Sequence, residues 1–400
     1  MQEQRQLLRS LSLTEISFYG IGTIVGAGIY VLLGKVVNES GMATPAAFLL
    51  SVIIAGFSAY SYAQMSRRFP NSAGEAVYIF EGLKSNHLSA LTGFAISVSG
   101  IVSAATLTSG FTGYFSFFSA LPQWTIITLL VVTLTTLACW GVKQSVIMAV
   151  LTTLIEIGGL LLVVIVSGDE IAHQEIPWGE FVPVFDQAHL TFVVSGAFLA
   201  FFAFIGFEDM VNLAEEVKNP ERNLPLGIAI ALVTTGLLYG AVAITALVTL
   251  PLAELSNSQA PLALLIEYNS NIPVEIMAVI SMIAIINGAL IQIIMVSRVL
   301  YGMAKRNIAP SLLGSVNPKT RTPITATLIT GTLVVIFALW LPITTLAKTT
   351  SSLILVVFTL VNLSLLVLNC REKNWGIPGL LAPTIGALLC ISFLGFQVWN

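Results

Sequence analysis

Residues 20–30 read GIGTIVGAGIY and lie inside an apolar run at about 13–37. Four glycines within nine residues weaken a helix, each by about 1 kcal/mol relative to alanine. In the middle of a membrane span, bare backbone is tolerated only where it faces protein or a cavity. The stretch therefore indicates either a broken membrane helix or close helix packing, since Gly22-x-x-x-Gly26 is a small-xxx-small pattern. A dinucleotide-binding loop is excluded, because the spacing is not G-x-G-x-x-G.

The rest of the chain has the composition of a membrane protein. Of its 400 residues, 56% are hydrophobic and 9% are charged, whereas soluble domains carry about 25% charged residues. Long apolar runs indicate membrane helices, because about 20 residues are needed to cross about 30 Å of hydrocarbon. Eleven such runs predict eleven spans, at about 13–37, 43–64, 88–118, 124–142, 146–167, 191–213, 225–250, 273–302, 324–342, 348–369 and 378–398.

The distribution of basic residues predicts the orientation of these spans. With residues 1–12 in the cytoplasm, all but two of the 17 lysines and arginines fall in or beside cytoplasmic segments, as the positive-inside rule requires. The two exceptions are Lys35 and Lys348, and the outer loops 168–190 and 251–272 contain no lysine or arginine. We therefore expect a multi-pass protein of the cell (inner) membrane, with a cytoplasmic N-terminus and an extracytoplasmic C-terminus.

A second interruption lies in the sixth apolar run. Residues 201–212 read FFAFIGFEDMVN, so that Gly206 is followed closely by two adjacent acids, Glu208 and Asp209. The first and sixth runs are corresponding members of two five-helix repeats, and interruptions at corresponding places are a strong sequence indication of a transporter binding site. Freed N–H groups at a half-helix start can bind a carboxylate, and freed carbonyls can bind an ammonium group.

Three stretches resemble one family of transporters. GIGTIVGAGIY, FFAFIGFEDMVNLAEEVKNPERNLPLGI and SRVLYGMAKRNIAP are similar to the amino acid–polyamine–organocation permease superfamily, nearest its cationic-amino-acid-transporter-like branch. The resemblance covers roughly residues 10–370. It implies an all-α, LeuT-type inverted-repeat fold, with repeats at 13–167 and 191–369 and an additional helix at 378–398.

The resemblance also implies the substrate contacts. The amides around Gly26, Ala27 and Gly28 would bind the carboxylate of an amino acid, and the carbonyls of Ile24, Phe202 and Ile205 would bind its amino group. Glu208 is expected near the substrate, with Asp209 as a further candidate, although either acid could instead cap the second half-helix. Other polar candidates, each equally able to form an interhelical hydrogen bond, are Ser103, Thr106, Asn287 and Asn362.

Glu156 is the candidate proton carrier. It lies in the middle of the fifth run, with Thr152, Thr153 and Gly159 within one turn, and this small, polar face indicates that it points into the bundle. An acid at membrane depth costs a few kcal/mol and is a functional candidate by default, although a structural, hydrogen-bonded Glu is the alternative. The resemblance implies that a LeuT-type sodium site would need a pair of hydroxyl groups on the eighth span. Residues 289–296 offer none, so sodium coupling is not expected.

These observations predict a secondary transporter that carries an amino acid by alternating access, through proton symport or exchange. A polyamine or organic amine exchanger and a non-transporting amino acid receptor remain alternatives. A channel is not favoured, since neither charged rings nor a carbonyl filter motif is present, and an enzyme is not expected. No cofactor, metal or nucleic acid is expected as a partner, and Cys139, Cys370 and Cys390 stand singly, which indicates no disulfide.

Overall fold

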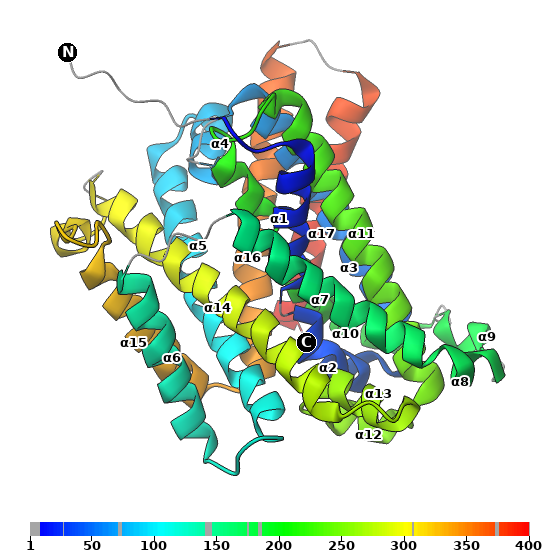
Figure 1. Ribbon diagram of the computed structural model, residues 1–400. Coiled ribbons are helices and arrows are strands. Elements are labelled where there is room, and N and C mark those ends of the chain that lie inside the picture. Colours follow the sequence, from blue (N-terminus) through cyan, green and yellow to red (C-terminus); the bar gives the residue numbers. More distant parts are fainter. Residues whose placement is uncertain are drawn as a thin grey trace.

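The computed structural model describes residues 9–26, 28–70, 74–140, 146–173, 176–182, 186–305, 308–372 and 376–399. Within these residues the chain folds into a bundle of helices (Figure 1). The one β-type pairing in this part is a bridge between Leu11 and Val217.

The first half of the chain supplies one broken helix and four continuous ones, with short connecting helices. Its elements are α1 (Leu13–Val25), α2 (Gly28–Ser40), η1 (Gly41–Ala43), α3 (Thr44–Arg68), α4 (Gly74–Leu83), α5 (Asn86–Phe115), α6 (Gln123–Trp140) and α7 (Val146–Val166). The connection to the second half contains α8 (Gly168–His173) and α9 (Trp178–Phe181).

The second half repeats this plan and adds a final helix. Its elements are α10 (Gln187–Ala200), η2 (Phe201–Phe204), η3 (Phe207–Leu213), α11 (Pro220–Thr249), α12 (Leu252–Asn257), α13 (Pro261–Asn269), α14 (Val274–Lys305), η4 (Ser311–Gly314), α15 (Ile324–Trp340), α16 (Ile343–Glu372) and α17 (Ile377–Trp399).

Each of the eleven apolar runs contains helix in the described residues. By length and hydropathy, nine helical segments there are able to cross a membrane, and one of them, Gly28–Arg68, contains both α2 and α3. Two shorter apolar helices, α1 and α15, account for the other runs. The short helices of the connections were not predicted, because they are too brief to carry a clear apolar period. Among them, α4 lies at the end of the bundle where α1 begins, and α12 and α13 lie at the opposite end (Figure 1).

Helices from the two halves pack against one another. α2 contacts α10, α3 contacts α11, and α5 contacts α14, while α1 packs on α7 and α11. The α5–α14 contact is close: a Cβ at Gly100 of α5 would lie 2.4 Å from Val296 Cγ2. Gly93, two turns earlier, faces Met303 in the same way, at 3.2 Å from its Sδ. These two helices therefore form a tightly packed wall beside the broken ones.

The start of α1 is fixed to the far end of the sixth span. Ser12 and Glu15 form a capping box, in which Ser12 N donates to Glu15 Oε2 at 2.7 Å, and such a box satisfies free helix-end amides. Just before it, Leu11 N donates to Glu216 O at 3.0 Å, and Lys218 N donates to Leu11 O at 2.8 Å. Both half-helices on this side of the bundle are therefore held by one backbone bridge.

Candidate functional site

The first span is broken at the predicted glycine cluster. α1 ends at Val25, Gly26 N still donates to Gly22 O at 2.9 Å, and α2 begins at Gly28. Ala27, predicted to bind a carboxylate, lies outside the described residues. Close packing, the competing explanation, also applies, since a Cβ at Gly22 would lie 2.0 Å from Thr153 Oγ1 of α7 and a Cβ at Gly28 would lie 2.4 Å from Ala203 Cα of η2. The glycine cluster therefore both contains the break and allows close packing.

The sixth span is broken at Ile205 and Gly206. Ile205 is extended, with ψ 137°, and Gly206 has φ 132°, a backbone conformation that residues with a side chain rarely adopt. A Cβ at Gly206 would also lie 2.6 Å from the carbonyl oxygen of Thr23. Both the backbone angle and the close approach of the first broken helix therefore require glycine here.

Hydrogen bonds hold the two breaks together. Thr23 Oγ1 lies 3.0 Å from Gly20 O and 3.0 Å from Gly206 O, so its single proton is shared between the two broken spans. From α11, the Tyr239 hydroxyl lies 2.8 Å from Ile24 O and 3.1 Å from Ala203 O, which again belong to both spans. Buried carbonyls left without helical partners need such donors. The two hydroxyls therefore stabilise the pair of breaks.

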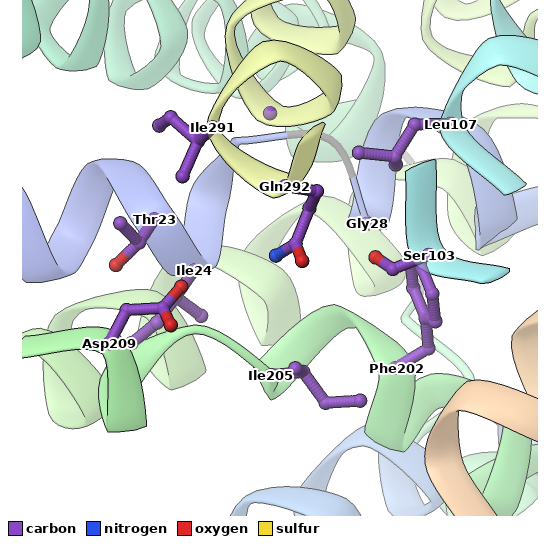
Figure 2. A pocket seen from close by; sticks show the side chains of 11 residues that line it. Thr23, Ile24, Gly28, Ser103, Leu107, Phe202, Ile205, Asp209, Ile291 and Gln292 are labelled. Carbon is purple, nitrogen blue, oxygen red and sulfur yellow. The ribbon is translucent and has the colours of Figure 1, made fainter. Parts of the chain in front are cut away.

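A pocket lies between the breaks, α5 and α14. In Figure 2 the Gln292 side chain reaches into the space between Thr23 and Ser103, and Asp209 approaches from η3. Its lining residues are Thr23, Ile24, Gly28, Ser103, Leu107, Phe202, Ile205, Asp209, Gly288, Ile291 and Gln292. Six of these, Ile24, Gly28, Ser103, Phe202, Ile205 and Asp209, are sequence-predicted candidates. Gln292 was missed, although it is the one polar side chain in the stretch ALIQIIMV.

The two adjacent acids point in different directions. Glu208 turns back toward the break, where its Oε2 accepts a hydrogen bond from Gly206 N at 2.8 Å, as a cap of the second half-helix would. Asp209 lines the pocket and is 8% exposed, and its carboxylate has no hydrogen-bond partner among the described residues. The structure therefore brings Asp209, rather than Glu208, to the pocket.

Glu156 lies behind the pocket rather than in its wall. Its side chain is fully buried, and Asn287 Nδ2 of α14 donates to its Oε1 at 3.2 Å. The Tyr30 hydroxyl donates to its backbone carbonyl at 2.5 Å, whereas Glu156 Oε2 has no partner in the described part of the chain. Two predicted candidates, Glu156 and Asn287, thus bind each other across α7 and α14.

The two remaining polar candidates make structural contacts. Asn362 Nδ2 of α16 donates to Ser58 Oγ of α3 at 3.0 Å, and Thr106 Oγ1 donates to Val102 O of its own helix at 2.9 Å. Neither residue lines the pocket. Interhelical or local bonding, the alternative stated for both, accounts for them.

A family model described as amino acid permease matches residues 11–399. The chain belongs to this family. The family model extends over both broken helices and the pocket between them, and the name of the family describes permeases rather than enzymes.

Two relatives and one solved structure extend this result. The chain is 29% identical to "Cationic amino acid transporter 3, mitochondrial" of Arabidopsis thaliana, over 91% of this chain but only 63% of that protein, and so spans less than two thirds of its length. It is 27% identical to the "Branched-chain amino acid permease BcaP" of Bacillus subtilis, over 99% of this chain and 91% of that one. A substrate-bound, outward-open Na⁺-coupled sialic acid symporter has a similar structure, with TM-score 0.60 at 12% identity, over 94% of this chain and 88% of that one. At this identity the likeness concerns the fold, and it confirms the expected all-α, LeuT-type membrane fold.

Proposed function

We propose that this family member is a secondary transporter that moves an amino acid across a cell membrane by alternating access. The observation that carries the proposal is the alignment of the two helix breaks around one pocket, where the main chain of both broken spans comes within reach of a single small ligand. Broken helices of this kind expose main-chain donors and acceptors that suit a zwitterion.

In this proposal, the pocket binds the substrate mainly through its backbone. The α-carboxylate is bound by N–H groups at the start of α2, where Gly28 lines the pocket, and the α-ammonium group by carbonyls at the breaks. The Gly26 N–H, although a candidate from the sequence, already donates to Gly22 O within α1. The Ile24 carbonyl already accepts from Tyr239, and the Phe202 carbonyl accepts from Ile205 N at 3.3 Å. Each carbonyl oxygen has two lone pairs, so both can still accept from a substrate.

We further propose that Glu156 carries the coupled proton. Its Oε1 is paired with Asn287, and its Oε2 is unpaired, so an ionised Glu156 would be an incompletely solvated charge in the membrane, which costs a few kcal/mol. Because α7 packs on α1 and α14, gain or loss of this proton would alter the contacts of a helix that adjoins the pocket. Coupling requires that the proton bind one conformation better than the other.

The proposed orientation follows the basic residues: a cytoplasmic N-terminus, an extracytoplasmic C-terminus and insertion in the cell membrane. α4 then faces the cytoplasm, and α12 and α13 face outward. This arrangement is supported by the positions of these helices at opposite ends of the bundle (Figure 1).

The first test is a thermal-shift screen of the purified, full-length protein against amino acids, polyamines and other small amines. A ligand stabilises the folded protein by mass action, by about 2.7 kcal/mol at a concentration 100 times its Kd. Each stabilising compound is then tested for counterflow in proteoliposomes. Saturable binding without counterflow would identify a receptor, and stabilisation by polyamines alone would favour an amine exchanger.

A further inference from the structure

A fourth buried acid, Glu75, lies on α4, outside the membrane spans. Glu75 is the second residue of α4, and its side chain is only 6% exposed. Its one side-chain donor among the described residues is the Tyr62 hydroxyl of α3, which lies 3.3 Å from Glu75 Oε1. Acids in short surface helices are ordinarily solvated. A buried acid with a single tyrosine donor, close to two more acids, therefore needs an explanation.

α4 is clamped between the sixth and tenth spans. A Cβ at Gly74, which has φ 42°, would lie 2.8 Å from Asn212 Oδ1 of η3. At the other end of α4, a Cβ at Gly82 would lie 2.5 Å from Ser364 Cβ of α16, and Arg371 donates to Gly82 O at 3.0 Å. The helix thus covers η3, the half-helix that carries Asp209 into the pocket.

Tyr62, the hydrogen-bond donor to Glu75, also belongs to an aromatic cluster next to the break in the sixth span. Its ring makes edge contacts with Tyr78 of α4, Phe207 of η3 and Phe358 of α16, with centroids 6.2, 5.5 and 5.3 Å away. Phe207 is the first residue of η3 and follows Gly206 directly. A change in the position of Tyr62 would therefore alter its contacts with α4 and with Phe207, the residue next to the break.

The charged and titratable groups that interact with Glu75 come from α3, α4 and η3. Tyr62 of α3 donates to it, Tyr78 is its neighbour on α4, and η3 places the carboxyl groups of Glu208 and Asp209 close enough to interact with it. From α16, Arg371 is engaged at Gly82, at the far end of α4. No cation among the described residues is bonded to the Glu75 carboxyl. Ionised Glu75 would therefore be a buried negative charge beside two further acids.

We propose that Glu75 is a cytoplasmic proton-binding site that controls how firmly α4 is docked over η3 and the inner side of the pocket. Neutral Glu75 fits the buried position beside Tyr62, whereas the ionised form favours an arrangement in which α4 is displaced and the carboxylate reaches water. The proton comes from and returns to the cytoplasm, and no other reactant is needed. The assignment of α4 to the cytoplasm rests on the proposed function and its orientation.

The direction of the pH effect follows from the burial of Glu75. Burial, reinforced by the charge of Asp209, raises the pKa of the Glu75 carboxyl from 4.5 to about 7. A group whose pKa is raised in the docked state stabilises that state fully at low pH and loses this contribution as pH rises from 4.5 to about 7. The equilibrium for displacement of α4 should therefore rise across this window, by at most about tenfold per pH unit, and level off above it.

Hydrogen–deuterium exchange of residues 74–83 in the full-length protein tests the proposal. Exchange is measured between pH 5 and pH 8 and corrected for the intrinsic pH dependence of amide exchange. In the wild type, protection of α4 should fall with rising pH up to about pH 7. Glu75→Gln should abolish this dependence. Glu81→Gln, which alters a half-buried acid on the same helix that pairs with Lys84, should follow the wild type.

A second variant keeps the proposal testable if Glu75→Gln folds poorly. Tyr62→Phe removes the hydrogen bond that favours the ionised carboxyl, and the transition should then move to higher pH. A wild-type α4 with pH-independent protection, or a Glu75→Gln variant with the wild-type slope, would overturn the proposal. Counterflow is measured on the same preparations. Its absence in the wild type at every pH would contradict the proposed transport function, whereas the hydrogen–deuterium exchange of α4 would still decide the role of Glu75.

Discussion

Asp209 and Gln292 are two polar side chains that line the pocket. The Asp209 carboxylate is buried and lacks a hydrogen-bond partner among the described residues, and Gln292 faces it from α14 (Figure 2). A buried carboxylate of this kind is costly unless a cation joins it. Asp209 is therefore placed to favour a substrate that carries a second cationic group.

We predict that Asp209→Asn weakens the binding of lysine by about tenfold or more, because a hydrogen bond to a charged group contributes about 1.5–3 kcal/mol. Leucine binding should change by less than about threefold, since its side chain has no charge to pair. Dissociation constants from isothermal titration of the purified variants measure both effects. Glu221→Gln, which alters an exposed acid at the start of α11, serves as the control. Equal losses for the two ligands would assign Asp209 to the α-amino group instead.

Glu156 is tested by a substitution that keeps its shape and removes its proton chemistry. Glu156→Gln should retain substrate exchange in proteoliposomes, because the residue lies outside the pocket wall, but should lose accumulation driven by an inward proton gradient. Wild-type uptake should respond to that gradient and be indifferent to sodium. If the wild type and Glu156→Gln accumulate substrate equally, Glu156 has a structural role only and simple exchange is favoured.

At the scale of the helical elements, the breaks depend on a few backbone positions. In Gly206→Ala, the alanine would have to adopt a φ of 132°, and its Cβ would lie 2.6 Å from Thr23 O. The substitution should therefore lower the unfolding free energy by about 1–3 kcal/mol and reduce ligand binding. Gly240→Ala, in the middle of α11 with open space around it, should instead leave the protein equally or slightly more stable. Thermal unfolding in detergent compares the two variants. An unchanged melting temperature for Gly206→Ala would mean that the break can relax without glycine.

The sequence was sufficient to predict the long elements and both breaks, because each depends on local composition: apolar runs of span length, and glycines at membrane depth. The direction in which a side chain points was harder to predict. Glu208 and Asp209 are adjacent, and only the positive φ of Gly206 and the 3-10 geometry of η3 decide which one enters the pocket. The pairing of Glu156 with Asn287 joins residues 131 positions apart, which no local pattern encodes. Gln292 could have been found as a lone amide in an apolar helix.

At the scale of the whole molecule, the orientation of the chain can be tested with one native thiol. Cys370 is free and exposed at the end of α16, on the side that the basic residues assign to the cytoplasm. A membrane-impermeant maleimide added to intact cells should miss Cys370 and should label Asn257→Cys, an exposed position at the end of α12. Cys370 should react only after permeabilisation. Labelling of Cys370 but not of residue 257 in intact cells would invert the proposed topology.

The close contact of α5 with α14 has a practical consequence for following motion in this protein. Gly100 packs against Val296 so closely that a Cβ would not fit there, and Gly93 packs against Met303, so a shift of one helix along the other would require these contacts to repack. Spectroscopic probes on the outer surfaces of this pair should therefore report constant separations under every condition. The distance between probes on α5 and α14 can therefore serve as a constant reference. Displacement of α1, α4 or η3 can be measured against it in a single labelled sample.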